Sequence, residues 1–285
     1  MIPAQFSYAR PESVEEAVSV LDSGGEDAKV ISGGQSLLPL LRLRLAYPDL
    51  LVDVGRLGEL RGVSDEGDTL LIGALTTHYD VTRDPLIKAH CGLLAEAAET
   101  VADPAVRHRG TLGGSLVHAD PAGDLPSVVV ALGATLTVRG PGGERQIDAT
   151  DFFADYLTTT LEPNEILTGI RVPKLGPGWG YHYEKFHRSA QAWAIVGVAA
   201  LARREDGHVA EARIGLTNMG PVPIRAAATE AAVAGAAVDP AALREAAAHA
   251  DEEASPPSDL HGAADYRRHL ARVLTARALA VAVGE

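Results

Sequence analysis

Apolar and polar positions recur along the first part of the chain with two different periods, and they predict mixed α and β structure. The apolar residues of 14–21 recur at helical spacing directly after Ser13 and Glu16, which form a capping box. Short apolar runs bounded by glycine and aspartate are typical of buried strands. The predicted elements are a helix from residue 14, a strand at 28–32, a helix at 36–46 and a strand at 50–54.

The middle of the chain also has patterns typical of both helices and strands. Thr77 to Asp80 resembles a helix cap, and the alanine-rich run 93–101 predicts a further helix. Pro141-Gly142-Gly143 indicates a turn between two strands. We interpret 107–126 as a loop because it is rich in glycine. The strands predicted in this region are 70–75, 135–139, 144–147 and 165–172.

The pattern changes after Pro173, where Gly176-Pro177-Gly178 has the composition of a linker. Three strand-like runs follow at 179–187, 193–203 and 209–218, and their close spacing favours an antiparallel meander. From residue 224 onward the chain is alanine-rich and helical, with a start at Asp239-Pro240 and a last helix at 265–283. We therefore expect two domains, 1–175 and 176–285, with the boundary near Leu175.

Composition and charge narrow the possible functions. The chain has 285 residues, and its 46% of hydrophobic residues suffice for a proper core. The formal net charge of -13 argues against nucleic-acid binding, so a bound anion must be held by backbone amides and a few local cations. The single cysteine, Cys91, is too few for an iron–sulfur cluster or a cysteine-rich zinc site, and we expect it to be an inert core residue.

We also expect a cytoplasmic protein. The N-terminus has no charged-then-apolar leader, and no apolar run approaches the ~20 residues of a membrane span.

Two glycine-rich segments are the strongest candidates for a binding site. They are SGGQSLLP at 32–39 and RGTLGGS at 109–115, and each keeps a hydroxyl beside its paired glycines. A glycine pair is ordinarily a tight turn, which is our interpretation of Gly24-Gly25 and Gly142-Gly143. The dinucleotide fingerprint and the P-loop are both absent. Successive bare amides near a helix start at Ser36 can nonetheless bind a diphosphate, with Ser36 and Ser115 as further donors.

These segments, with DPAGDLP at 120–126, PNEILTGIRVP at 163–173 and YEKF at 183–186, make the chain similar to one family. It resembles the FAD-binding subunit of the molybdenum hydroxylases, which include xanthine dehydrogenase and aerobic carbon monoxide dehydrogenase. The resemblance covers essentially the whole chain. It implies an α+β fold with a two-subdomain FAD-binding domain of the vanillyl-alcohol-oxidase/PCMH type, subdomains about 1–57 and 58–175, followed by a small C-terminal domain of antiparallel sheet and helices.

The resemblance also implies the cofactor contacts. Two loops would clasp the FAD diphosphate, an aspartate would lie near the ribose or adenine, and Lys185 and Trp193 would lie near the flavin. An exposed strand lysine and a core tryptophan are the simpler alternatives for these two. The implied residues are Ile31, Ser32, Gly33, Gly34, Gln35, Ser36, Val101, Thr111, Leu112, Gly113, Gly114, Ser115, Asp124, Leu161, Lys185 and Trp193.

The implied function is electron transfer by FAD, with no catalytic side chain and no metal ligand in this chain. The molybdenum cofactor and the 2Fe-2S clusters are expected in a large and a small partner subunit, in a dimer of three-subunit units. A non-catalytic nucleotide-binding or assembly module and a self-sufficient flavin oxidase are the alternatives. Gln35 stands where carbon monoxide oxidisers often carry histidine, which disfavours that substrate, and Trp193 stands where a tyrosine is expected, which changes the expected environment of the flavin. Neither the substrate nor the final electron acceptor follows from the sequence.

One basic run near the C-terminus has two interpretations. Arg267, Arg268 and Arg272 are expected to form a solvated helix face, with docking to a neighbouring subunit as the alternative.

Overall fold

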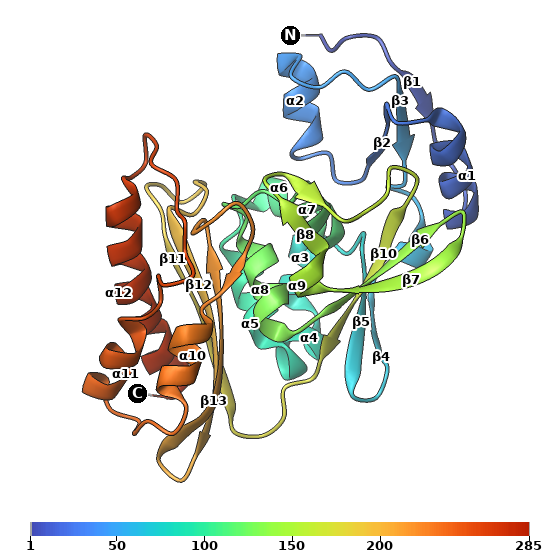
Figure 1. Ribbon diagram of the computed structural model, residues 1–285. Coiled ribbons are helices and arrows are strands. Elements are labelled where there is room, and N and C mark those ends of the chain that lie inside the picture. Colours follow the sequence, from blue (N-terminus) through green and yellow to red (C-terminus); the bar gives the residue numbers. More distant parts are fainter. Residues whose placement is uncertain (1, 285) are drawn as a thin grey trace.

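The computed structural model describes residues 2–284, built around three main sheets that follow one another along the chain (Figure 1). Met1 and Glu285, the end residues of the two predicted domains, lie outside the described residues. The first sheet is parallel, in the order β1-β3-β2, and α1 packs on it. Its elements are β1 (Ser7–Ala9), α1 (Val14–Gly24), β2 (Ala28–Ile31), α2 (Leu37–Leu43) and β3 (Leu50–Asp53).

The predicted start of helix α1 is confirmed. The Ser13 hydroxyl accepts a hydrogen bond from the amide of Glu16 at 3.1 Å, and the Glu16 carboxylate accepts one from the amide of Glu12 at 2.7 Å. The helix ends before Gly25, whose φ of 71° is one that glycine adopts without strain. The residues that α1 buries are Val14, Ala17, Val18 and Leu21.

The second sheet is antiparallel, in the order β4-β5-β10-β6-β7. Its strands are β4 (Val63–Asp65), β5 (Thr69–Gly73), β6 (Thr135–Gly140), β7 (Gly143–Asp148) and β10 (Ile166–Pro173). The short elements near it are η1 (Gly58–Leu60), α3 (His78–Arg83), α4 (Pro85–His90), α5 (Gly92–Glu99), α9 (Ala149–Phe152), β8 (Phe153–Asp155) and β9 (Thr158–Thr159). Cys91 is buried between α4 and α5, and burial raises its pKa to about 12, which keeps the thiol protonated.

The prediction of a loop at 107–126 is wrong, because most of this stretch is helical. It contains the end of α6 (Pro104–Arg107), all of α7 (Leu112–His118) and the start of α8 (Asp124–Leu132). The Thr111 hydroxyl caps α7 by accepting from the amide of Gly114 at 3.1 Å, and α7 then buries Leu112 and Leu116 in the core. Capping and burial here outweigh the poor helix propensity of paired glycines.

The third sheet is the predicted antiparallel meander, in the order β11-β12-β13-β14. Helices α10 to α12 cover one face, and α5 and α8 of the preceding part lie on the other (Figure 1). Its elements are β11 (Trp179–Phe186), β12 (Val196–Glu205), β13 (His208–Thr217), β14 (Ile224–Arg225), α10 (Ala227–Val233), α11 (Pro240–Ala247) and α12 (Ala264–Ala282). Trp193 was expected to begin a strand, but it belongs to the connection before β12, where the Ala192 amide donates to the Ser189 carbonyl in a turn.

The prediction of a solvated arginine face on α12 is wrong for Arg267 and right for Arg272, whose side chain is 49% exposed. Arg267 is fully buried, and its guanidinium donates to both carboxylate oxygens of Asp259 at 2.8 Å. Arg272 donates to the carboxylate of Asp251 at 2.6 and 2.8 Å, and this partner lowers the pKa of Asp251. Arg268 donates to two backbone carbonyls of the same region. These side chains hold residues 251–259 on the helix.

A buried ion pair joins the third sheet to helix α8. The ammonium of Lys185 on β11 donates to a carboxylate oxygen of Asp124 at 2.8 Å and to the Thr100 carbonyl at 3.0 Å. The Tyr183 hydroxyl donates to the other oxygen of Asp124 at 2.8 Å. Both charged side chains are almost inaccessible, at 3% and 4% exposed. Burial raises the pKa of Asp124, an effect that the Lys185 ammonium opposes.

We predict that Lys185→Met lowers the free energy of unfolding by about 3 kcal/mol, because the Asp124 carboxylate loses its cation inside the protein. Chemical denaturation of the isolated chain measures this change. Lys174→Met is the matched control, since Lys174 pairs with the half-exposed carboxylate of Asp65 and should contribute little. The double variant Asp124→Asn, Lys185→Met should recover part of the loss. Equal stability of the two single variants would contradict the role given to the buried pair.

Candidate functional site: a cleft between two glycine segments

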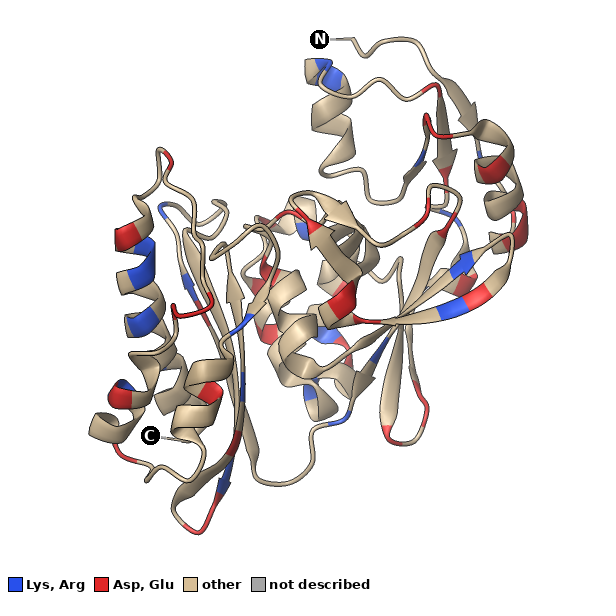
Figure 2. Cartoon of the chain, in the orientation of Figure 1, with Lys and Arg blue, Asp and Glu red and all other residues tan. Residues whose placement is uncertain are grey.

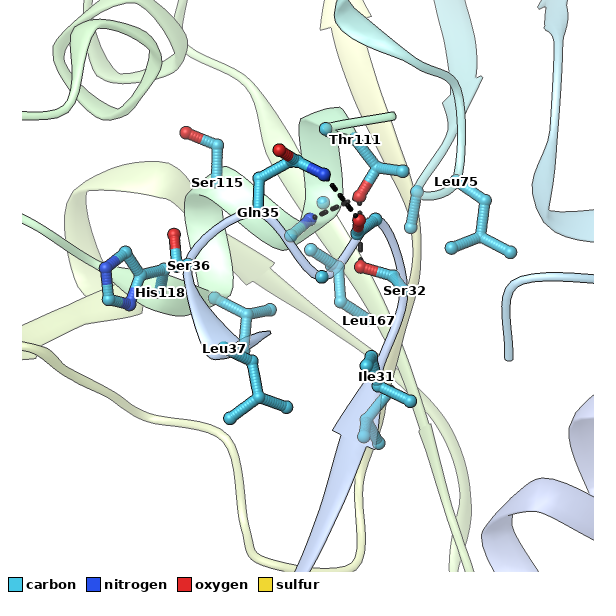
Figure 3. A pocket seen from close by; sticks show the side chains of 18 of the residues that line it. Ile31, Ser32, Gln35, Ser36, Leu37, Leu75, Thr111, Ser115, His118 and Leu167 are labelled. Carbon is cyan, nitrogen blue, oxygen red and sulfur yellow. Dashed lines mark hydrogen bonds between the residues drawn. The ribbon is translucent and has the colours of Figure 1, made fainter. Parts of the chain in front are cut away.

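A cleft of about 570 Å³ lies between the first sheet and the second, within the usual size range of a cofactor site. The connection from β2 to α2 forms one wall and helix α7 forms the facing wall (Figure 3). Residues 159–167 close a third side, and Gln191 and Trp193 reach the cleft from the connection between β11 and β12. Parts of the chain that carry all three main sheets therefore contribute to one cavity.

Gly33 brings the two glycine segments into direct backbone contact. A Cβ atom placed on Gly33 would lie 2.2 Å from the carbonyl oxygen of Arg109, so any side chain there would push the segments apart. Gly34 has a φ of 73°, a conformation that other residues adopt only with strain. The missing side chain of Gly33 therefore first serves to let the two segments touch.

The first segment presents a run of amides without partners. In the described part of the chain, the N–H groups of residues 33–37 donate to no protein acceptor. Ser36 is the N-cap of α2, yet its hydroxyl makes no capping bond and stays available. Gln35 donates its side-chain amide to the Gly33 carbonyl at 3.2 Å, which fixes the turn. Successive free amides of this kind form a concavity that suits an anion.

The second segment is different, because its amides are already used. Those of Gly113, Gly114 and Ser115 donate to the Ala74 carbonyl, the Thr111 hydroxyl and the Thr111 carbonyl, at 2.9, 3.1 and 3.0 Å. A hydrogen bond of 3.2 Å between the hydroxyls of Ser32 and Thr111 joins the segments (Figure 3). Of the two loops implied to clasp the diphosphate, this one therefore supplies the Ser115 hydroxyl and a rigid wall but no free amides at residues 113–115.

The cleft brings together fourteen of the sixteen residues expected at the site. Leu112 does not line it, because its side chain is buried in the core. Lys185 does not line the cleft; its ammonium binds Asp124 and the Thr100 carbonyl behind the wall, and its burial contradicts the alternative of an exposed strand lysine. Trp193 is 56% exposed, which rules out the core alternative for this side chain. The lining residues are Ile31, Ser32, Gly33, Gly34, Gln35, Ser36, Val101, Thr111, Gly113, Gly114, Ser115, Asp124, Leu161 and Trp193.

Sequence reasoning missed several residues of the cleft. His78 and His118 line it, and so do Leu37, Leu40 and Ile166. The sequence of Thr77 to Asp80 predicted only a helix start. His78 follows directly after a predicted strand and a turn, and this position could have marked it as a candidate residue of the site. The leucines carried no such signal, since their positions depend on how the two sheets meet.

His78 is held neutral inside the wall. It is only 4% exposed, and burial together with the nearby Arg107 cation lowers its pKa from 6.5 to about 4. Its Nδ1 atom has no hydrogen-bond partner among the described residues. Below pH 6.5 the unfolded chain takes up a proton at this imidazole while the folded chain does not until about pH 4, so acidification favours unfolding in that window.

We predict that His78→Leu removes about 2 kcal/mol of the stability that the chain loses between pH 7 and pH 4.5. Denaturant unfolding at both pH values measures this difference. His261→Leu, at an exposed histidine, is the matched control and should retain the full loss. A His78→Leu variant with the acid sensitivity of the parent chain would show that His78 is not held neutral.

The residues of the cleft fit FAD. Free amides and hydroxyls at one place suit a diphosphate, and the apolar side chains of Val101, Leu161 and Trp193 suit a flavin ring. Lys29 is the one cation among the described residues that line the cleft, so the backbone supplies most of the positive potential. Within residues 2–284, no group of histidine, cysteine and acidic side chains is arranged to hold a metal ion.

Comparison with known protein families agrees with this fit. Residues 4–175 match the family described as the FAD binding domain in molybdopterin dehydrogenase. Residues 181–282 match the CO dehydrogenase flavoprotein C-terminal domain. The two matches together cover nearly the whole chain.

Similar proteins extend over the same length. The chain is 42% identical to the carbon monoxide dehydrogenase medium chain of Hydrogenophaga pseudoflava, over 98% of this chain and 97% of that one. It is 37% identical to subunit alpha of the 6-hydroxypseudooxynicotine dehydrogenase complex of Paenarthrobacter nicotinovorans, over 99% and 96%. A solved carbon monoxide dehydrogenase from H. pseudoflava that lacks the Mo-pyranopterin moiety superimposes with a TM-score of 0.96 at 44% identity, covering 99% and 98%. The chain therefore belongs to the FAD-binding medium subunits of the carbon monoxide dehydrogenase and xanthine dehydrogenase family of oxidoreductases.

Proposed function

We propose that this chain is the electron-transfer subunit of a three-subunit molybdenum hydroxylase. Its FAD takes electrons from 2Fe-2S clusters in a small subunit and passes them to an external acceptor, while a large molybdenum subunit oxidises the substrate. The observation that carries the proposal is the cleft, where free amides of residues 33–37 face a wall on α7. We place the complex in the cytoplasm as a dimer of such units. Within residues 2–284, no helix combines the length and apolar character needed to cross a bilayer.

In this proposal the chain binds and orients the cofactor. The diphosphate accepts hydrogen bonds from the amides of residues 33–37 and from Ser36 and Ser115. Val101, Leu161 and Trp193 enclose the flavin, and Asp124 lies on the ribose or adenine side. Bound FAD supplies the redox chemistry, so no side chain needs to act as an acid or base. Lys185 is a positioning residue that holds Asp124 and the carbonyl next to Val101.

The other redox groups belong to partner chains in this proposal. The single cysteine is buried and protonated, so the chain offers no thiolate for a cluster. We divide the chain into a FAD-binding domain at 1–175, with subdomains at about 1–57 and 58–175, and a C-terminal domain at 176–285. The family matches at 4–175 and 181–282 support this division.

We predict that Gly33→Ala weakens FAD binding at least tenfold in the three-subunit complex, because the added methyl group meets the Arg109 carbonyl and separates the two walls. Equilibrium dialysis against FAD measures the affinity. Gly142→Ala is the matched control, since a Cβ atom there meets nothing within 4 Å.

A second variant tests the same placement without disturbing the packing. Ser36→Ala removes a hydroxyl that has no capping bond, and it should weaken FAD binding roughly fivefold to tenfold, the effect of one lost hydrogen bond. FAD binding as tight as in the Gly142→Ala control, in both variants, would contradict the diphosphate site.

We predict that reduced iron–sulfur clusters of the partner subunit reduce the FAD of this chain. The partner subunits, separated from this chain, are reduced with dithionite, freed of excess reductant and mixed with FAD-loaded chain, and the flavin absorbance should bleach as the cluster signal reoxidises. Chain stripped of FAD is the control and should leave the clusters reduced. Flavin that stays oxidised beside reduced clusters would contradict the electron-transfer role.

A further inference from the structure

The two walls that face each other across the cleft carry one titratable side chain between them. They are residues 31–41 and 110–119, and neither contains a lysine, an arginine or an acidic residue (Figure 2). The one titratable side chain is that of His118, the last residue of α7. It lines the cleft and is 26% exposed, so a ligand in the cleft can reach it.

His118 lies on the same face of α7 as Ser115, which we assign to the diphosphate. Thr111, Ser115 and His118 are separated by four and three positions, so their side chains follow one another along one face of the helix. Figure 3 shows Ser115 and His118 at the same end of the cleft as Ser36, which comes from the facing segment. The imidazole therefore shares one ligand space with the two hydroxyls that we assign to the diphosphate.

The ring nitrogens of His118 are available to a ligand. Among the described residues the imidazole has no hydrogen-bond partner, and a carboxylate oxygen of Asp120 lies 3.9 Å from its Nε2 atom, beyond hydrogen-bond distance. The other oxygen of Asp120 accepts from the Ala122 amide at 2.9 Å, which fixes this carboxylate in its turn. Asp120 therefore adds a nearby negative charge without occupying either ring nitrogen.

A diphosphate at this place has little positive charge around it. Esterified at both ends, it carries two negative charges, while backbone amides contribute only partial charges. The ammonium of Lys29 is exposed and already donates to the Glu26 carbonyl at 2.8 Å. Protonation of His118 is therefore the one way in which the two walls can supply a full positive charge.

The other charged or titratable groups of the cleft do not replace this imidazole. Asp124 is paired with Lys185 at 2.8 Å, and Glu165 with Arg145 at 2.7 Å. Burial lowers the pKa of His78 to about 4, so that side chain stays neutral near pH 7. Among the described residues, the charged or titratable side chains that share the cleft are Lys29, His78, Asp120, Asp124, Glu162 and Glu165.

We propose that His118 is a cofactor-binding residue that donates a hydrogen bond, as an imidazolium, to the diphosphate of FAD; this step rests on the proposed function. A hydrogen bond between two charged groups is shorter and stronger than one from a neutral ring. Where the free imidazole is neutral, FAD binding takes up one proton from the solvent, and that proton stays on His118. The affinity for FAD therefore falls as the pH rises.

Two other roles of His118 lead to different results. A neutral imidazole that stacks on a ring of FAD would contribute the same affinity at every pH. An imidazole that only shapes the wall would lose affinity on substitution by a similar factor at every pH. Neither role links FAD binding to a proton.

The test measures FAD binding to the three-subunit complex, stripped of FAD, by equilibrium dialysis at pH 6 and pH 8.5. The parent complex should bind FAD about tenfold more tightly at pH 6, the effect of one hydrogen bond to a charged group. His118→Gln should bind weakly at both pH values. His118→Lys keeps a cation at both, and it should bind FAD at pH 8.5 nearly as tightly as the parent does at pH 6.

His108→Gln is the matched control. His108 is an exposed histidine that stacks on Tyr79 and does not line the cleft, so this variant should keep the pH dependence of the parent. A His118→Gln variant with the same pH dependence as the parent would overturn the proposal. A His118→Lys variant that binds as weakly as His118→Gln would also overturn it.

ADP-ribose tests which half of FAD the imidazolium contacts. It carries a diphosphate esterified at both ends, as FAD does, but no flavin. It should compete with FAD more strongly at pH 6 than at pH 8.5 in the parent complex, and equally at both in His118→Gln. Competition that does not change with pH in the parent, or no competition, would overturn the diphosphate contact. FAD binding without pH dependence refutes only the role of His118, whereas failure of the parent complex to bind FAD at either pH refutes the proposed function, and His118 falls with it.

Discussion

The backbone contact between Gly33 and Arg109 is the constraint on which the rest of this structure depends. It sets the distance between the first sheet and helix α7, and the width of the cleft follows from that distance. The Ser32 and Thr111 hydroxyls add a hydrogen bond across the same contact. Because the second segment satisfies its own amides, it forms a firm wall, and the free amides of residues 33–37 remain for a ligand.

This arrangement explains how an acidic protein can hold an anionic cofactor. The positive potential comes from oriented backbone N–H groups, which need no basic surface and leave the net charge unchanged. The C-terminal part supports the cleft from behind, where Lys185 and Tyr183 fix the Asp124 carboxylate between them. The cofactor site, the contact between the sheets and the buried ion pair are therefore parts of one structure, although they come from distant parts of the sequence.

Local signals in the sequence predicted most elements, and the family resemblance implied most of the residues of the cleft. Caps such as Ser13 and the Asp239-Pro240 pair act within a few residues, so they can be read directly. The helix at α7 could not be read, because its glycines oppose a helix and the burial of Leu112 and Leu116 decides the outcome. The buried position of Lys185 and the ion pairs of α12 were missed for a related reason. Their partners lie far away along the chain, and no spacing in the sequence shows them.

The central claim concerns the place of one group, the diphosphate of FAD. A crystal structure of the three-subunit complex with FAD bound tests it most directly. The account predicts diphosphate oxygens within about 3 Å of amide nitrogens in residues 33–37, the distance of a hydrogen bond. A diphosphate held elsewhere, with those amides bound to water or to protein, would contradict it.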